Sequence, residues 1–275
     1  MDTLQRALIE KAGNDNGFEY VLPAASAAVE LGSARHKARV AIDQASAGSF
    51  RVRLTVGNAL LQGELARSFP TLLQTDGAFC VDTINSLVRF LRRAAVLAQA
   101  LPNHAATEYA RKVQKEFAKL SPDLIKHTEI QAMVRQRVGQ QAFREAMLDY
   151  WGGACAVTGI AVPAVLRASH AKPWAECESD AERLDVFNGF LLCANLDSLF
   201  DRYLISFDAN GKLKVSNTIA ETDRSRLGLL APLQLRWLAA DHERYLKLHR
   251  ERFSRADSGK VEPSMIDATH SNLME

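Results

Sequence analysis

The chain has 275 residues, with 34 Lys and Arg against 32 Asp and Glu and a formal net charge of +2. This length exceeds the roughly 100 to 200 residues of a usual domain, so we expect two compact units. Hydrophobic residues make up 47% of the chain, which is ample for a core. The near balance of charges excludes a uniformly basic nucleic-acid binder, so any such surface must be local.

No apolar run approaches the roughly 18 residues of a membrane span. The opening segment MDTLQRALIEKAG is charged throughout, unlike a signal peptide. The cysteines Cys80, Cys155, Cys177 and Cys193 are scattered and form no CxxC pair. We therefore expect free thiols in the cytoplasm and no structural zinc. A zinc site that combines the last three cysteines with a histidine is the alternative.

The first part of the chain predicts a mixed α/β domain. Helical periodicity is found over residues 2–13, 78–101 and 105–119. Residues 37–43 and 49–56 instead alternate between apolar and polar side chains, which predicts two strands joined as a hairpin.

The second strand of this hairpin predicts one basic face. Arg51 and Arg53 alternate with apolar residues, so they share the solvent face and are candidate DNA contacts. Basic residues also outnumber acidic ones between Arg89 and Arg144. Such a stripe could neutralise phosphates. The alternative is the solvated face of long helices.

Four aromatic residues of the first part could line a pocket for a flipped base: Phe18, Tyr20, Phe50 and Phe79. The alternative is that these rings belong to the core.

A domain boundary is expected at residues 121–123. The sequence there is Ser-Pro-Asp, in which Ser can cap a helix and Pro is accepted in the first turn. We therefore expect a recognition or sensor domain over residues 1–120 and a second domain over residues 121–255. Residues 256–275 are polar and aperiodic and predict a flexible tail.

The end of the second domain predicts a hairpin over residues 206–216 with an Asn-Gly turn, and a helix over residues 231–253. His242, His249 and His270 lie in or beyond this region, and we expect them at the surface.

The most informative segment runs from Cys155 to Asp208. Within it, AVLRAS is short and apolar, leads to His170 and is soon followed by Pro173, which predicts a strand that ends at the histidine. An imidazole titrates near neutrality, which suits a general base. The sequence FNGFLLC then predicts a tight turn of positive φ at Asn188-Gly189, followed by a second strand.

The sequence NLDSLFDRYL predicts a helix that places Asp197 and Asp201 on one face. Two carboxylates four residues apart can bind one hard cation, and oxygen ligands favour Mg²⁺ or Mn²⁺ over Zn²⁺. The cation would neutralise a scissile phosphate while a neutral His170 activates water. An amide both donates and accepts, so Asn188 can tie the loop between the strands to the backbone and help hold the useful imidazole tautomer.

These motifs, ASHAKPW, NGFLLCANLDSLFD and YLISFD, resemble HNH endonucleases of the ββα-metal class. The resemblance implies that His170 is the general base and that Asn188 is the structural middle residue of the motif. It places Asp197 where many members carry the final histidine and makes Asp201 the second helix ligand. Ser169 stands where many members have an aspartate or histidine ligand, and a hydroxyl is a weak replacement.

The resemblance implies an α+β protein: a mixed α/β specificity-type domain followed by a C-terminal ββα-metal nuclease domain with flanking helices. It implies a metal-dependent enzyme that hydrolyses phosphodiester bonds of double-stranded DNA. In bacteria such enzymes act in restriction and defence, with an N-terminal domain that selects the target, including modified bases. Arg167, Lys172 and Arg202 are the candidate DNA contacts beside the motif.

One such site cuts one strand, so we expect a homodimer. Two alternatives remain open. In one, the N-terminal domain binds a small molecule or a protein and gates the nuclease. In the other, the protein binds DNA and its catalytic site is degenerate.

Overall fold

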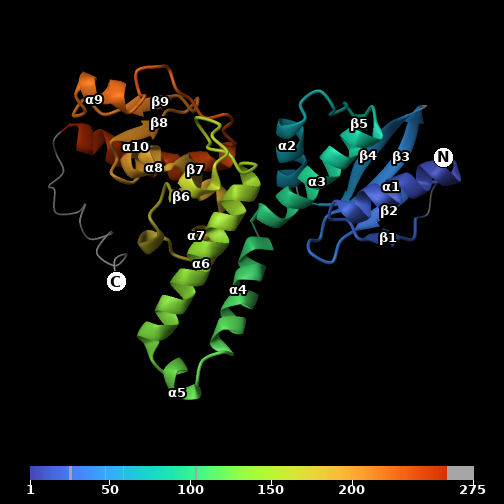
Figure 1. The fold of residues 1–275 in the computed structure, drawn as a ribbon, viewed down its shortest axis with the longest axis horizontal. Coiled ribbons are helices and arrows are strands. Elements are labelled where there is room, and N and C mark those ends of the chain that lie inside the picture. The colour runs from blue at the N-terminus through green and yellow to red at the C-terminus, as the bar shows by residue number, and fades with distance from the viewer. Residues whose placement is uncertain (25–26, 47, 58, 103, 259–275) are drawn as a thin grey trace. The chain divides into compact units, whose positions relative to one another are not determined.

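The computed structural model describes residues 1–24, 27–46, 48–57, 59–102 and 104–258. It divides into two compact units, Met1–His104 and Ala105–Glu275 (Figure 1). Both units mix helices and strands, so the predicted α+β class is confirmed.

The first unit is built on an antiparallel sheet of five strands in the order β1-β2-β3-β4-β5. The strands are β1 (Tyr20–Leu22), β2 (Val29–Gly32), β3 (Arg39–Ser46), β4 (Ser49–Val56) and β5 (Phe79–Val81). Strands β3 and β4 form the predicted hairpin. The other three strands have only three or four residues each, too few for an alternating pattern to indicate them.

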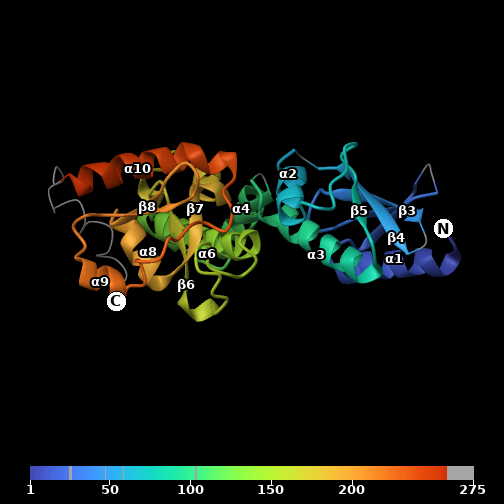
Figure 2. The ribbon, with the colours of Figure 1, turned by 90° about the horizontal axis from the view of Figure 1, so that it is seen from above.

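Three helices accompany this sheet: α1 (Thr3–Asp15), α2 (Ala59–Ser68) and α3 (Ile84–Ala100). Figure 2 shows α1 and α3 next to each other beside the sheet. Helix α3 begins later than predicted, because residues 79–81 pair with β4 and the Thr83 side chain caps the helix by accepting from the Ser86 amide.

The aromatic residues proposed for a flipped base do not form a pocket. Phe18, Phe50 and Phe79 are buried in the core of the first unit, whereas Tyr20 is exposed. The interpretation as a base pocket is therefore wrong for these residues, because the rings of Phe18, Phe50 and Phe79 contribute to the hydrophobic core and Tyr20 lies apart from them at the surface.

The second unit contains α4 (His104–Phe117), α5 (Pro122–Ile125), α6 (Thr128–Tyr150), α7 (Asp180–Arg183), α8 (Ala194–Asp201), α9 (Glu221–Arg226) and α10 (Glu243–Asp257). Helices α4 and α6 lie side by side (Figure 1). The Tyr109 hydroxyl donates to the Arg135 carbonyl at 3.2 Å, and Lys112 pairs with Glu145 at 2.6 Å. Helix α4 thus packs within the second unit.

Two short antiparallel ribbons complete this unit. Strand β6 (Leu166–His170) pairs with β7 (Gly189–Cys193), and β8 (Ile205–Phe207) pairs with β9 (Leu213–Val215). Gly211 has a φ of 77° in the turn of the second ribbon, as its Asn-Gly sequence predicts.

The helix predicted over residues 231–253 begins only at Glu243. The preceding segment is extended because Gln234 forms a β-bridge with Lys212 and the Leu233 carbonyl accepts from the Leu213 amide at 2.8 Å. The predicted tail lies largely outside the described residues, and so does His270. No helix in the described part of the chain is long and apolar enough to cross a membrane.

The expectation that His242 and His249 lie at the surface is wrong, because both are buried. The His249 ring stacks on Phe200 at 3.7 Å, and its two nitrogens contact the Ser206 hydroxyl and the Phe200 carbonyl. Burial lowers the pKa of His249 to about 4. Both histidines therefore belong to the interior of the second unit.

Candidate active site

The site is built on the β6–β7 ribbon and helix α8. His170 ends β6 and lies opposite Gly189, while Ser169 lies opposite Phe190. Helix α8 follows β7 directly, so the two strands and the helix form a continuous ββα unit. The predicted strand ending at His170 and the predicted helix carrying Asp197 are both present.

Gly189 lets the two strands approach closely. Its φ is 172°, which is extended backbone, and Asn188 ends a short 3₁₀ turn over Val186–Asn188. The predicted positive-φ turn at this pair is therefore wrong. A Cβ atom at Gly189 would lie 2.1 Å from the Ser169 carbonyl oxygen, so glycine is required here for space.

His170 is enclosed on the side of the ribbon that faces α6. Its ring stacks on Phe143 with centroids 3.8 Å apart, and Trp174 meets it edge-on at 5.8 Å. Trp174 in turn packs over Gly139 of α6, where a Cβ atom would lie 2.2 Å from the indole. Burial lowers the pKa of His170 to about 4, so its imidazole is neutral at pH 7.

A backbone carbonyl fixes the tautomer of this imidazole. The Nε2 atom of His170 lies 2.9 Å from the Arg183 carbonyl oxygen. A carbonyl only accepts, so Nε2 must carry the proton and Nδ1 must keep its lone pair. The neutral ring can therefore take up a proton at Nδ1.

The side chain of Arg183 fixes the segment that surrounds His170. Its guanidinium donates to the carbonyls of Trp174 at 3.3 Å and Cys177 at 2.5 Å, and to the Asp180 carboxylate at 3.1 Å. One residue thus ties down Trp174 and supplies the acceptor for the imidazole. Sequence reasoning missed Arg183, because an arginine in a polar segment follows no pattern that indicates this role.

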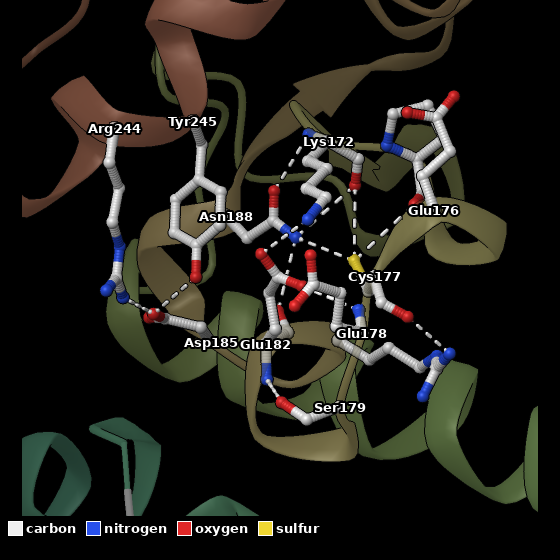
Figure 3. Close-up of polar contacts among 12 residues, drawn as sticks. Lys172, Glu176, Cys177, Glu178, Ser179, Glu182, Asp185, Asn188, Arg244 and Tyr245 are labelled. Atoms are coloured by element: carbon white, nitrogen blue, oxygen red, sulfur yellow. Dashed lines mark hydrogen bonds and ion pairs between the residues drawn. The ribbon is translucent and has the colours of Figure 1, made fainter.

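Asn188 is fully buried and ties the loop between β6 and β7 to itself (Figure 3). Its Oδ1 accepts from the Lys172 amide at 2.8 Å. Its Nδ2 donates to the carbonyls of Lys172 and Glu182, at 3.3 and 3.2 Å. Glu182 directly precedes Arg183, so Asn188 acts on the imidazole through the backbone of this loop.

The turn before Asn188 is fastened to helix α10 (Figure 3). The buried Asp185 carboxylate accepts from the Phe187 amide at 2.9 Å, from the Tyr245 hydroxyl at 3.0 Å and from the Arg244 guanidinium. Burial raises the pKa of Asp185, and these hydrogen bonds offset part of that rise.

The opposite face of the ribbon carries carboxylates. The Ser169 hydroxyl donates to Asp197 Oδ1 at 2.5 Å. Desolvation and the neighbouring Asp197 charge raise the pKa of Asp201 to about 7, although the exposure of the residue lets water screen part of this effect. Two carboxylates on one helix face are thus short of positive charge.

Successive side chains of a strand point to opposite faces, so Ser169 faces α8 and His170 faces α6. The described contacts bring Ser169 and Asp197 together and do not join either to His170. Ser169 and His170 are the last two residues of β6, so both side chains lie at this end of the strand. A reacting group that uses both must lie there.

The donor set on the α8 face fits a hard cation, since it consists of carboxylate and hydroxyl oxygens. Within the described ranges, no three His, Cys, Asp or Glu side chains come close enough to hold a metal ion. Asp197 and Asp201 would therefore need water, Ser169 or a phosphate oxygen to complete a coordination shell.

The cysteines of the zinc alternative lie in two separate places. Thr158 contacts the sulfurs of Cys155 and Cys193, at 3.4 and 3.2 Å, whereas Cys177 donates to the carbonyls of Lys172 and Pro173. A site that combines all three with a histidine is therefore not formed.

Of the five candidate DNA contacts, three are paired with carboxylates. Lys172 pairs with Glu182 at 2.8 Å, Arg51 with Asp76 and Arg53 with Asp43. Arg167 and Arg202 differ: they donate to main-chain carbonyls and to the Ser198 hydroxyl.

A family of known proteins matches the segment that forms this site. Residues 155–208 match a family model described as HNH endonuclease. No curated protein matches the chain. The matched segment contains both strands of the ribbon and helix α8, so the C-terminal half of the chain contains an HNH-type domain, and this domain supports a nuclease.

Proposed function

We propose that the second unit is an endonuclease that hydrolyses phosphodiester bonds of double-stranded DNA with the aid of Mg²⁺ or Mn²⁺. The observation that carries this proposal is the state of His170. Its imidazole is neutral, and its Nε2–H is held by the Arg183 carbonyl on the face opposite Asp197, at the end of the strand that Ser169 and His170 share. A base of fixed tautomer next to oxygen ligands is what phosphodiester hydrolysis requires.

In this proposal His170 takes a proton from water at Nδ1 while the water oxygen attacks the phosphorus, the P–O bond to the leaving nucleotide oxygen breaks, and that oxygen takes a proton from solvent. The Arg183 carbonyl stabilises the imidazolium that forms, because it accepts from the opposite nitrogen. Asp197 and Asp201, assisted by Ser169, would hold the divalent cation, which when bound neutralises charge on the phosphate. Asn188 keeps the loop that carries the Arg183 carbonyl in place.

Arg167 and Arg202 are the proposed phosphate contacts beside the cut. Neither forms an ion pair with a carboxylate of the described residues, although the charge of Arg202 offsets part of the rise in the pKa of Asp201 that burial and Asp197 cause. By contrast, Glu182 pairs with Lys172, Asp76 with Arg51 and Asp43 with Arg53. Those three remain proposed contacts only where a phosphate displaces the carboxylate.

We further propose that the first unit selects the target and that the enzyme acts in restriction or defence in the cytoplasm. Cutting both strands then requires two copies, as in a homodimer. The four free thiols support a reducing compartment.

The test is plasmid nicking by the purified protein with Mg²⁺ or Mn²⁺, on DNA that is unmodified, methylated or hydroxymethylated. Wild type should nick at least one of these DNAs, and His170→Ala should lower the rate by about 10² to 10⁴-fold. Duplex affinity should stay unchanged, because the imidazole is enclosed by Phe143 and the Arg183 carbonyl.

Arg226→Ala is the matched control, since Arg226 is exposed on α9 and pairs only with Asp223 in the described part of the chain. Mn²⁺ binding followed by electron paramagnetic resonance gives a second measurement, which Asp197→Ala should weaken. Absence of cleavage of every DNA by wild type would contradict the proposal. Full activity of His170→Ala would contradict the assignment of the base.

A further inference from the structure

A short apolar loop in front of β6 is exposed to solvent. Its six residues are Ile160, Ala161, Val162, Pro163, Ala164 and Val165, and all of them are exposed. The exposed fractions of the three largest side chains are 44% for Ile160, 53% for Val162 and 41% for Val165. Burial of one such side chain stabilises by about 1.5 to 3 kcal/mol, so a cluster of three marks a surface that is covered in a complex.

Two arginines hold this loop in one conformation. Arg144 donates to the carbonyls of Leu166 at 2.6 Å and Pro163 at 3.0 Å. Arg167 donates to the Ala164 carbonyl at 2.9 Å. The Ile160 carbonyl also accepts from the Cys155 amide at 2.9 Å. A loop held in this way loses little conformational entropy when it binds a partner.

The loop lies close to the proposed site of cleavage. It runs directly into β6, and Val165 is four residues before Ser169. Four strand residues span about 13 Å. Successive nucleotides of a duplex are about 3.4 Å apart, so the loop lies about four base-pair steps from a phosphate held at Ser169 and Asp197.

The charge around the loop favours a polyanion as the occupant. No Asp or Glu occurs from Cys155 to Ala175, whereas Arg167 lies within this stretch and Arg144 donates to its carbonyls at Pro163 and Leu166. Arg167 is exposed at the base of the loop. Aliphatic side chains flanked by arginine are a combination that proteins insert against bases in the minor groove.

We propose that loop 160–165 is a DNA-docking wedge. Its aliphatic side chains insert into the minor groove about four base pairs from the cut, and Arg167 binds the phosphate backbone beside them. This inference rests on the proposed nuclease function, because the cut site fixes the position of the duplex.

The experiment uses the full chain with His170→Ala, which binds duplex without cutting it. The probe is a set of duplexes with 2-aminopurine placed in turn at each position along the whole duplex, counted from the nick where wild type makes one. Fluorescence should rise at positions about four base pairs from the nick, because an inserted side chain unstacks the base. The pair Ile160→Ser and Val162→Ser should abolish this rise and weaken affinity at least about 10-fold.

The salt dependence separates the two parts of the wedge. Affinity of the serine variant should keep the salt slope of the parent, because apolar contacts release no counterions. Arg167→Gln should instead reduce the slope by about one. Leu230→Ser and Leu248→Ser are matched controls, since both leucines are exposed elsewhere in the second unit. Thermal unfolding should be unchanged in the serine variants, whereas Arg167→Gln loses its hydrogen bonds to the Ala164 and Leu166 carbonyls and should unfold at a slightly lower temperature.

Unchanged affinity and unchanged fluorescence in the serine variant would overturn the wedge. A variant that loses only self-association, measured by light scattering, would also overturn it and would assign the loop to a contact between copies. If wild type fails to cut while the serine variant still loses affinity and fluorescence at one position of the duplex, the nuclease function fails and the docking loop stands.

Discussion

The two faces of the β6–β7 ribbon surround their titratable side chains differently, with aromatic rings and a carbonyl on one face and a second carboxylate on the other. On one face His170 is held by Phe143, Trp174 and the Arg183 carbonyl, and burial keeps it neutral. On the other face Asp197 and Asp201 repel each other, and the pKa of Asp201 rises to about 7. Burial therefore keeps His170 neutral, whereas desolvation and a neighbouring negative charge act together on Asp201.

This difference arises between adjacent residues, Ser169 and His170, because side chains alternate along a strand. Changes on the imidazole face should alter the position of the His170 ring and leave the pKa of Asp201 unchanged. Changes on the carboxylate face should shift the pKa of Asp201 and leave the position of the His170 ring unchanged. Each prediction below tests one side of this contrast, starting with a change that affects both.

Gly189→Ala should disrupt both faces. The new Cβ would lie 2.1 Å from the Ser169 carbonyl, so the strands must separate, at about 3 kcal/mol or more of unfolding free energy. Urea unfolding followed by tryptophan fluorescence measures this, because the three tryptophans, Trp151, Trp174 and Trp237, all lie in the second unit.

The matched control is Gly63→Ala in α2, where a Cβ atom meets nothing within 4 Å. That variant should leave the tryptophan transition unchanged. An unchanged urea midpoint for Gly189→Ala would refute the close approach of the two strands.

Arg183→Met should affect only the imidazole face. It removes the hydrogen bonds to the Trp174 and Cys177 carbonyls, so the carbonyl that holds His170 Nε2 loses its support. We expect kcat to fall about 10 to 100-fold with KM for DNA unchanged. Nitrogen-15 NMR of the His170 ring should show a mixture of tautomers.

Arg183→Lys should recover part of the rate, since an ammonium can reach one of the two carbonyls. Arg226→Met is again the control. If Arg183→Met keeps one tautomer and full kcat, then packing by Phe143 alone positions the base, and the role of Arg183 is refuted.

Asp197→Asn should affect only the carboxylate face, and its effect on stability should be small. Removal of the neighbouring charge favours ionised Asp201, so the pKa of Asp201 should fall from about 7, while desolvation keeps it above the ordinary aspartate value. In the parent, the free energy of unfolding decreases as pH rises from the ordinary aspartate pKa of 3.8 to the raised pKa of Asp201, about 7. In the variant this decrease should span a narrower pH range.

Carbon-13 NMR of the Asp201 carboxyl in the presence of a chelator measures this pKa. Asp223→Asn on α9 is the control and should leave it unchanged. A constant pKa in Asp197→Asn would show that desolvation alone raises it.

Much of the site could be predicted from the sequence, because its elements have clear periodicity. Strand β6 and helix α8 lie where the apolar patterns place them, with His170, Asp197 and Asp201 at the expected positions. The sequence predicts a positive φ at Gly189, whereas the structure requires glycine there because the Ser169 carbonyl leaves no space for a Cβ atom. A pattern shows that glycine is present but not whether φ or space requires it.

The partners of the imidazole could not be predicted. Phe143 lies far upstream in α6, and Arg183 acts through a main-chain carbonyl, which every residue possesses. The same limit applies to His249, whose burial depends on the stacking of Phe200. Contacts between distant segments leave no local pattern in the sequence.

The rotation of helix α6 about its own axis determines which of its residues face the site. Gly139 seats Trp174, Phe143 stacks on His170, and Arg144 clamps the apolar loop. A helix turns about 100° per residue, so inserting one residue between Arg135, which contacts α4, and Gly139 would turn all three together relative to that contact. The rotation of α6 about its axis therefore sets the positions of His170, Trp174 and loop 160–165 at the same time.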